Sequence, residues 1–166
     1  ADACIEAADQ LRRDDPNPDP QRLQRWLGRA CDGGVARACT DLGWLVAAED
    51  AERAADLYGR GCSGGDPHGC FDLAVVTELG TGVPPDPAAA ATLYDQACAG
   101  GDGQACHNLG ALRNRGAAPA FGAGVLRDPA AASVAFREGC RLGVAEACTA
   151  AAYLGDASAA QIDAWF

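Results

Sequence analysis

The chain has 166 residues, which is enough for one compact domain or one short array of repeats. Twenty-three acidic residues against 13 basic ones, all of them Arg, give a net charge of −10. This charge argues against a nucleic-acid partner, because such partners require a basic face. It allows a basic protein partner, although solubility alone explains it as well. No run of eighteen apolar residues occurs, so the sequence predicts no membrane span.

Nine cysteines organise the chain. Eight of them form four pairs in which the members are eight positions apart: Cys31 and Cys39, Cys62 and Cys70, Cys98 and Cys106, Cys140 and Cys148. The first members of successive pairs are 31, 36 and 42 residues apart, which is the period of helix-pair repeats. The spacing therefore predicts a single all-α repeat array over residues 1–166.

In chain order we expect helices near 1–13, 20–33, 36–48, 51–64, 67–79, 87–100, 103–114, 129–142, 145–154 and 157–166. The helices that end at the first Cys of a pair (20–33, 51–64, 87–100 and 129–142) are called the B helices. The helices that begin at the second Cys (36–48, 67–79, 103–114 and 145–154) are called the A helices. Cys4 fits the start of another A helix, within 1–13, whose partner Cys would precede residue 1. We therefore expect the chain to begin inside a longer array, and Cys4 to be a free thiol or a site of adventitious dimerisation.

The predicted ends of the B helices rest on recurring residues. An Asp stands twelve positions before each first Cys, at Asp19, Asp50, Asp86 and Asp128, and Pro follows it in three of the four cases. Asp caps a helix by accepting a backbone N–H, and Pro suits the first helical position because it has no N–H to satisfy. A Gly stands three positions after each first Cys, at Gly34, Gly65, Gly101 and Gly143. Because Gly adopts the left-handed conformation readily, we expect it to end the helix.

Two chemical roles are open to the paired cysteines. A helix end and the next helix start, joined by a tight turn, bring two Cβ atoms within disulfide reach. Disulfides indicate an oxidising compartment, outside the cytoplasm. The alternative is a zinc site, but zinc requires pairs that converge, and these pairs lie in separate repeats. We therefore expect no metal.

The recurring series Asp-Pro-x-x-Ala-Ala-x-x-Tyr/Phe-x-x-x-Cys, then Gly, then Ala-Cys-x-x-Leu-Gly, then Gly-x-Gly-Val resembles the Sel-1-like repeat family. The cysteine pairing resembles its disulfide-bearing branch, the Helicobacter cysteine-rich proteins. The resemblance implies a right-handed superhelix of antiparallel helix pairs, similar to tetratricopeptide repeats, with one disulfide in each unit. It also implies export, with a signal sequence upstream of this chain, and an adaptor role in the envelope or the extracellular space.

Two columns of residues on the A helices are the candidate partner-binding residues. Glu6, Asp41, Asp72 and Asn108 stand two positions after successive A-helix cysteines, and Trp44 and Tyr153 stand five positions after them. Carboxylates suit a basic or extended peptide, and aromatic side chains dominate the energy of protein interfaces. In tetratricopeptide-like grooves an Asn on an A helix holds the peptide backbone, and Asn108 resembles it. The alternative is that all six are ordinary solvated or half-buried helix positions.

The sequence contains no catalytic constellation. A phosphate-binding loop of the Walker type and the Ser-x-x-Lys motif both need Lys, which is absent. We therefore expect a non-enzymatic protein-binding module without a cofactor, whose partner is another protein or an extended peptide. A dedicated inhibitor of one secreted protein or toxin, and a structural segment of a larger array, remain as alternatives.

Overall fold

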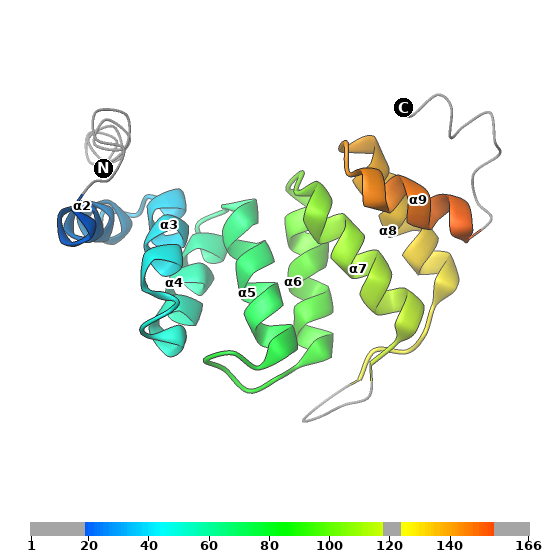
Figure 1. Cartoon of the computed structure of the whole chain (residues 1–166), viewed down its shortest axis with the longest axis horizontal. Helices are drawn as coiled ribbons and strands as arrows, with labels where there is room; N and C mark the ends of the chain where they lie inside the picture. Colours follow the sequence, from blue (N-terminus) through cyan, green and yellow to red (C-terminus); the bar gives the residue numbers. More distant parts are fainter. Residues whose placement is uncertain (1–18, 118–123, 155–166) are drawn as a thin grey trace.

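The computed structural model describes residues 19–117 and 124–154. The described helices follow one another in chain order along the long axis of the molecule (Figure 1). They are α2 (Pro20–Asp32), α3 (Ala36–Val46), α4 (Ala51–Ser63), α5 (Pro67–Leu79), α6 (Pro87–Ala99), α7 (Gly103–Arg115), α8 (Pro129–Arg141) and α9 (Ala145–Tyr153). The even-numbered helices are the B helices, and α3, α5, α7 and α9 are the A helices. The helices expected near 1–13 and 157–166, with Cys4 and Glu6, lie outside the described residues.

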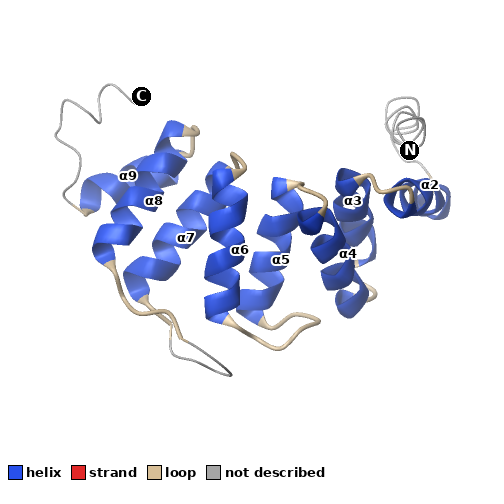
Figure 2. Ribbon diagram, turned by 180° about the vertical axis from the view of Figure 1, so that it is seen from behind, coloured by secondary structure: helices blue, strands red, loops and turns tan. Residues whose placement is uncertain are grey.

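Each helix packs against the next one in the chain, and the A helices α3 with α5 and α7 with α9 also contact each other. The tight turns from B to A helices lie along one edge of the array, and the longer A-to-B loops lie along the opposite edge (Figure 2). Among the described residues the only β-pairing is an isolated bridge between Ala117 and Val125, at the ends of the α7–α8 loop. The predicted all-α solenoid of antiparallel helix pairs is confirmed.

The four B helices begin as their sequence predicts. The side chains of Asp19, Asp50, Asp86 and Asp128 each accept a backbone N–H from the first turn of α2, α4, α6 and α8, respectively. Each of these hydrogen bonds satisfies a donor that has no partner within the helix.

The four B-to-A turns share one backbone conformation. Gly34, Gly65, Gly101 and Gly143 have φ of 86°, 89°, 95° and 90°, which is the left-handed region that we expected of them. In the first turn the N–H of Val35 donates to the carbonyl of Ala30, and the same bond recurs at the other three turns. This is the hydrogen bond of a Schellman helix end, and it folds the chain back at once.

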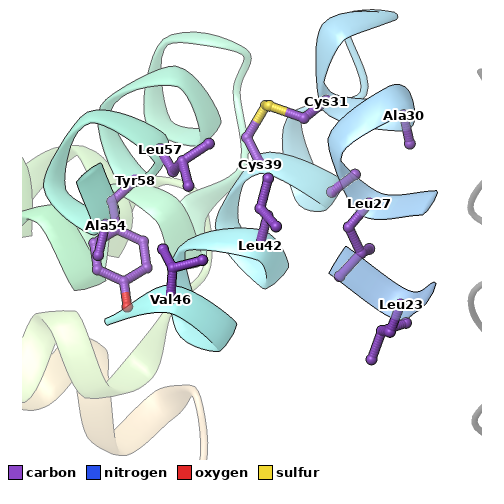
Figure 3. Packing of buried hydrophobic residues seen from close by; sticks show 11 residues of the cluster. Leu23, Leu27, Ala30, Cys31, Cys39, Leu42, Val46, Ala54, Leu57 and Tyr58 are labelled. Atoms are coloured by element: carbon purple, nitrogen blue, oxygen red, sulfur yellow. A yellow bond between two sulfur atoms is a disulfide. The ribbon is translucent and has the colours of Figure 1, made fainter. Parts of the chain in front are cut away.

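Small residues let the helices approach closely. A Cβ added to Gly43 would lie 2.6 Å from the ring of Tyr58, and one added to Gly110 would lie 2.6 Å from the ring of Phe136. Both rings are buried, and both stand four positions before the B-helix Cys of their unit. Figure 3 shows Tyr58 in the cluster between α2, α3 and α4, with Leu42 and Val46. None of the described helices is both long and apolar enough to cross a membrane.

Candidate functional site

Each cysteine pair forms a disulfide across a B-to-A turn. The Cα atoms are 4.7 Å apart in Cys31–Cys39, 4.3 Å in Cys62–Cys70, 4.7 Å in Cys98–Cys106 and 4.5 Å in Cys140–Cys148. The turn geometry above brings these atoms together, because the last turn of one helix lies beside the first turn of the next. The pairing decides in favour of disulfides over zinc ligation at these sulfur atoms.

The A helices α3, α5 and α7 line an open hollow of about 360 Å³. Its walls carry aromatic, acidic and basic side chains, so it is neither a plain apolar pocket nor a plain charged surface. The lining residues are Arg37, Thr40, Asp41, Trp44, Asp66, His68, Phe71, Asp72, Asp102 and Gln104. We call this hollow the A-face groove.

Two hydrogen bonds join α3 to the N-terminal half of α5 across the groove. The indole Nε1–H of Trp44 donates to Oδ2 of Asp72 at 2.7 Å, although 66% of the Trp44 surface stays exposed. The hydroxyl of Thr40, which is buried, donates to Oδ2 of Asp66 at 2.6 Å. The other oxygen of Asp66 accepts the backbone N–H of His68 and thereby caps α5. One carboxylate therefore starts a helix and holds the preceding A helix beside it.

The Thr40 hydroxyl needs space that two glycines provide. A Cβ on Gly61 would lie 2.3 Å from Oγ1 of Thr40, and one on Gly69 would lie 2.7 Å from the same atom. At the corresponding positions around the Cys98–Cys106 disulfide stand Ala97 and Ala105. The α4–α5 turn is thus adapted to admit this side chain.

A similar contact joins α5 to α7. Nδ1 of His68 lies 3.0 Å from Oδ2 of Asp102, whose Oδ1 accepts the backbone N–H of Ala105 and caps α7. The Asp102 side chain is buried, whereas that of His68 is 65% exposed. The A helices α3 and α5, and likewise α5 and α7, are therefore connected through the capping Asp of the following helix.

Asp72 has an unusual electrostatic environment. Burial raises its pKa to about 6, and the negative charges of Asp102 and Asp66 contribute in the same direction. The hydrogen bond from Trp44 and the nearby His68 oppose that rise. Near neutral pH the carboxyl group is therefore ionised although only 8% of the residue is exposed, a costly arrangement that is frequent at functional sites.

The groove brings together three of the six predicted partner-binding residues, Asp41, Trp44 and Asp72. Asn108 does not line it, because its Nδ2 faces the hydroxyl of Tyr94 at a distance of 3.4 Å. Tyr153 is 90% exposed and lines a separate hollow at the α9 end of the array.

Sequence reasoning missed several lining residues. Arg37, His68 and Gln104 stand two positions before the A-helix cysteines, one helical turn before the column of Asp41, Asp72 and Asn108. A search extended by one turn along the same helix face would have found them. Thr40 and Phe71 each directly follow an A-helix Cys, and Asp102 stands four positions before one, as Asp66 does. Within residues 19–117 and 124–154, no three His, Cys, Asp or Glu side chains are grouped so as to hold a metal ion.

Comparison with known proteins identifies the fold. No family model matches the chain, and no curated protein matches it. Among solved structures, a Sel1 repeat protein from Oxalobacter formigenes superposes with a TM-score of 0.75 at 23% identity, over 89% of this chain and 62% of that one. The protein c5321, a protective antigen present in uropathogenic Escherichia coli strains, gives 0.71 at 22% identity, over 86% of this chain and 32% of that one.

Cysteine rich protein B of Helicobacter pylori gives a TM-score of 0.61 at 24% identity, over 79% of this chain and 93% of that one. The chain thus spans less than two thirds of the length of the first two proteins and most of the length of the third. Its structure, with one disulfide at each B-to-A turn of the described array, is that of a Sel1 repeat solenoid.

Proposed function

We propose that this chain is a non-enzymatic protein-binding module that holds an extended segment of a partner protein in the A-face groove. The observation that carries the proposal is the pair formed by Trp44 and Asp72. A large aromatic side chain remains exposed there while its indole N–H is fixed by a buried, ionised carboxylate. Exposed aromatic residues anchor protein interfaces, and a fixed side chain loses little entropy on binding.

The packing of the helices supports this face. The alternate helices that contact each other are α3 with α5 and α7 with α9, and all of these are A helices. Helices on the inner side of a curved array lie closer together than those on its outer side, so the A face is the concave one in this proposal. Concave surfaces of repeat arrays suit extended ligands.

We further propose that the module acts in the periplasm or outside the cell. The four disulfides support this location, because such bonds persist in oxidising compartments and are rare in the cytosol.

Selection from a displayed library of random linear peptides tests the proposed binding face. Peptides that bind the oxidised protein should bind Trp44→Ala roughly tenfold more weakly or worse. The control is Val134→Ala, because Val134 is an exposed apolar residue on the B helix α8, and this change should leave binding intact. Recovery of no binding peptide, or of peptides indifferent to Trp44→Ala, would contradict the proposal and favour a structural segment without a binding role in this stretch.

A further inference from the structure

The A-face groove carries a marked excess of negative charge. Its walls contain four carboxylates, from Asp41, Asp66, Asp72 and Asp102, against one guanidinium, from Arg37, and one imidazole. The chain as a whole has a net charge of −10, so its background potential has the same sign. An anionic ligand is therefore disfavoured at this surface, and a cationic one is attracted to it.

The aromatic part of the groove narrows the choice of cation. Trp44 and Phe71 line the same hollow as the carboxylates. Because Nε1 of Trp44 is bound to Asp72, the exposed ring is held beside this carboxylate instead of rotating away from it. An aromatic surface next to a carboxylate matches a side chain that has an apolar stem and a charged, planar head.

The burial of Asp72 favours the binding of a cation at its carboxylate. Most of its surface is removed from water, and the described residues supply one hydrogen bond to its carboxylate, from Trp44. A guanidinium group that donates to this carboxylate restores part of the solvation lost on folding.

We propose, building on the proposed function, that the A-face groove recognises an arginine side chain of the bound partner segment, with the guanidinium between the Trp44 ring and the carboxylates of Asp41 and Asp72. The partner is accordingly a protein with a basic, extended segment. Arginine is preferred over lysine because its planar head stacks on an indole while it donates hydrogen bonds to a carboxylate.

The direct test uses N-acetyl-arginine amide and its neutral analogue N-acetyl-citrulline amide as probes of the isotopically labelled, oxidised protein. Titration with the arginine compound should shift the indole N–H resonance of Trp44, and citrulline at the same concentrations should leave it in place. Asp72→Asn and Asp41→Asn should each weaken the arginine response roughly 3- to 10-fold. Asp56→Asn removes the same charge from an exposed position on the B helix α4 and should leave the response unchanged. Equal responses to both compounds, or an undiminished response in Asp72→Asn, overturn the inference.

The peptide library separates this inference from the proposed function. Selected peptides that are enriched in arginine and that lose affinity in Asp72→Asn support both. Selected peptides that lack basic residues but still require Trp44 leave the proposed function standing and overturn the inference. Failure to select any peptide that requires Trp44 overturns both.

Discussion

The two middle B-to-A turns and the two outer ones share a backbone but differ in one side chain. Four positions before the A-helix Cys, the middle turns carry Asp66 and Asp102, and the outer turns carry Val35 and Val144. The two Asp residues cap α5 and α7, whereas α3 and α9 begin without a side-chain cap. The left-handed glycine, the backbone hydrogen bonds and the disulfide are nevertheless the same in all four turns.

This difference separates the residues that build the array from those that build the groove. Glycine and cysteine are sufficient for the turn, because Val35 and Val144 allow the same conformation. The Asp residues add contacts to the preceding A helix, through Thr40 in one case and His68 in the other. The A-face groove therefore lies at the two middle turns, where polar contacts between A helices are added to the backbone and disulfide geometry that all four turns share.

The largest expected effect tests the disulfides, which all four B-to-A turns share. Replacing both cysteines of Cys98–Cys106 by Ser should lower the free energy of unfolding by about 2–3 kcal/mol, because the unfolded chain loses a closed loop. The disulfide Cys140–Cys148 closes a loop of equal length, so the same replacement there opens that loop and should cost a similar amount. Urea unfolding followed by circular dichroism measures both variants. A negligible loss of unfolding free energy at only one of the two turns would show that the disulfides do not stabilise the middle and outer turns equally.

Gly61→Ala tests the adaptation of the α4–α5 turn. We expect a loss of about 2–3 kcal/mol in unfolding free energy, because the new Cβ collides with the Thr40 hydroxyl. In a Thr40→Ala background the same change should cost clearly less, since the colliding atom is gone. Ala97→Gly, the reverse change at the α6–α7 turn, is the control and should cost about 1–2 kcal/mol from helix propensity and the loss of one buried methyl group. Additive losses in Gly61→Ala and Thr40→Ala would refute the packing explanation.

Asp72→Asn tests the electrostatic cost of the groove. Burial raises the folded-state pKa of Asp72 from 3.8 to about 6, so the folded protein favours the protonated carboxyl group. The contribution of this group to the unfolding free energy is therefore fully present below about pH 4 and is lost as the pH rises through about 6. The variant should therefore match the wild type at acid pH and exceed it by about 1–2 kcal/mol at pH 8, after allowance for partial solvent screening. Unfolding free energies measured from pH 4 to pH 8 give the difference. A constant difference over this range would show that the Asp72 carboxyl is not destabilised by burial.

The helix starts, turns and disulfides were predictable from the sequence because each depends on residues close together in the chain. Asp caps, left-handed glycines and cysteines at a fixed separation act within a few residues, so their consequences follow from spacing alone. Trp44 and Asp72 were placed on one face by the same periodicity. Their mutual hydrogen bond was not predicted, because it depends on the distance between successive A helices.

The distance between successive A helices also explains why spacing from the A-helix Cys did not predict every contact. Asn108 occupies the position of Asp72 in the next repeat, yet its amide faces the hydroxyl of Tyr94 on α6. Asp66 caps α5 as Asp102 caps α7, but its second partner, Thr40, is not at the position equivalent to that of His68, which contacts Asp102. Contacts that change position from repeat to repeat leave no periodic signal.

The smallest expected effect tests how much the contact between α5 and α7 contributes to the unfolding free energy. His68→Ala should lower the unfolding free energy by about 0.5 kcal/mol or less at neutral pH, because the imidazole is largely exposed and its pairing is screened by water. Asp102→Ala should cost about 1 kcal/mol, because it also removes the cap that satisfies the N–H of Ala105. Urea unfolding of both variants under identical conditions resolves the order. If His68→Ala proves as costly as Asp102→Ala, the pairing itself, more than the helix cap, holds α7 beside α5, and the middle turns differ from the outer ones through their inter-repeat contacts.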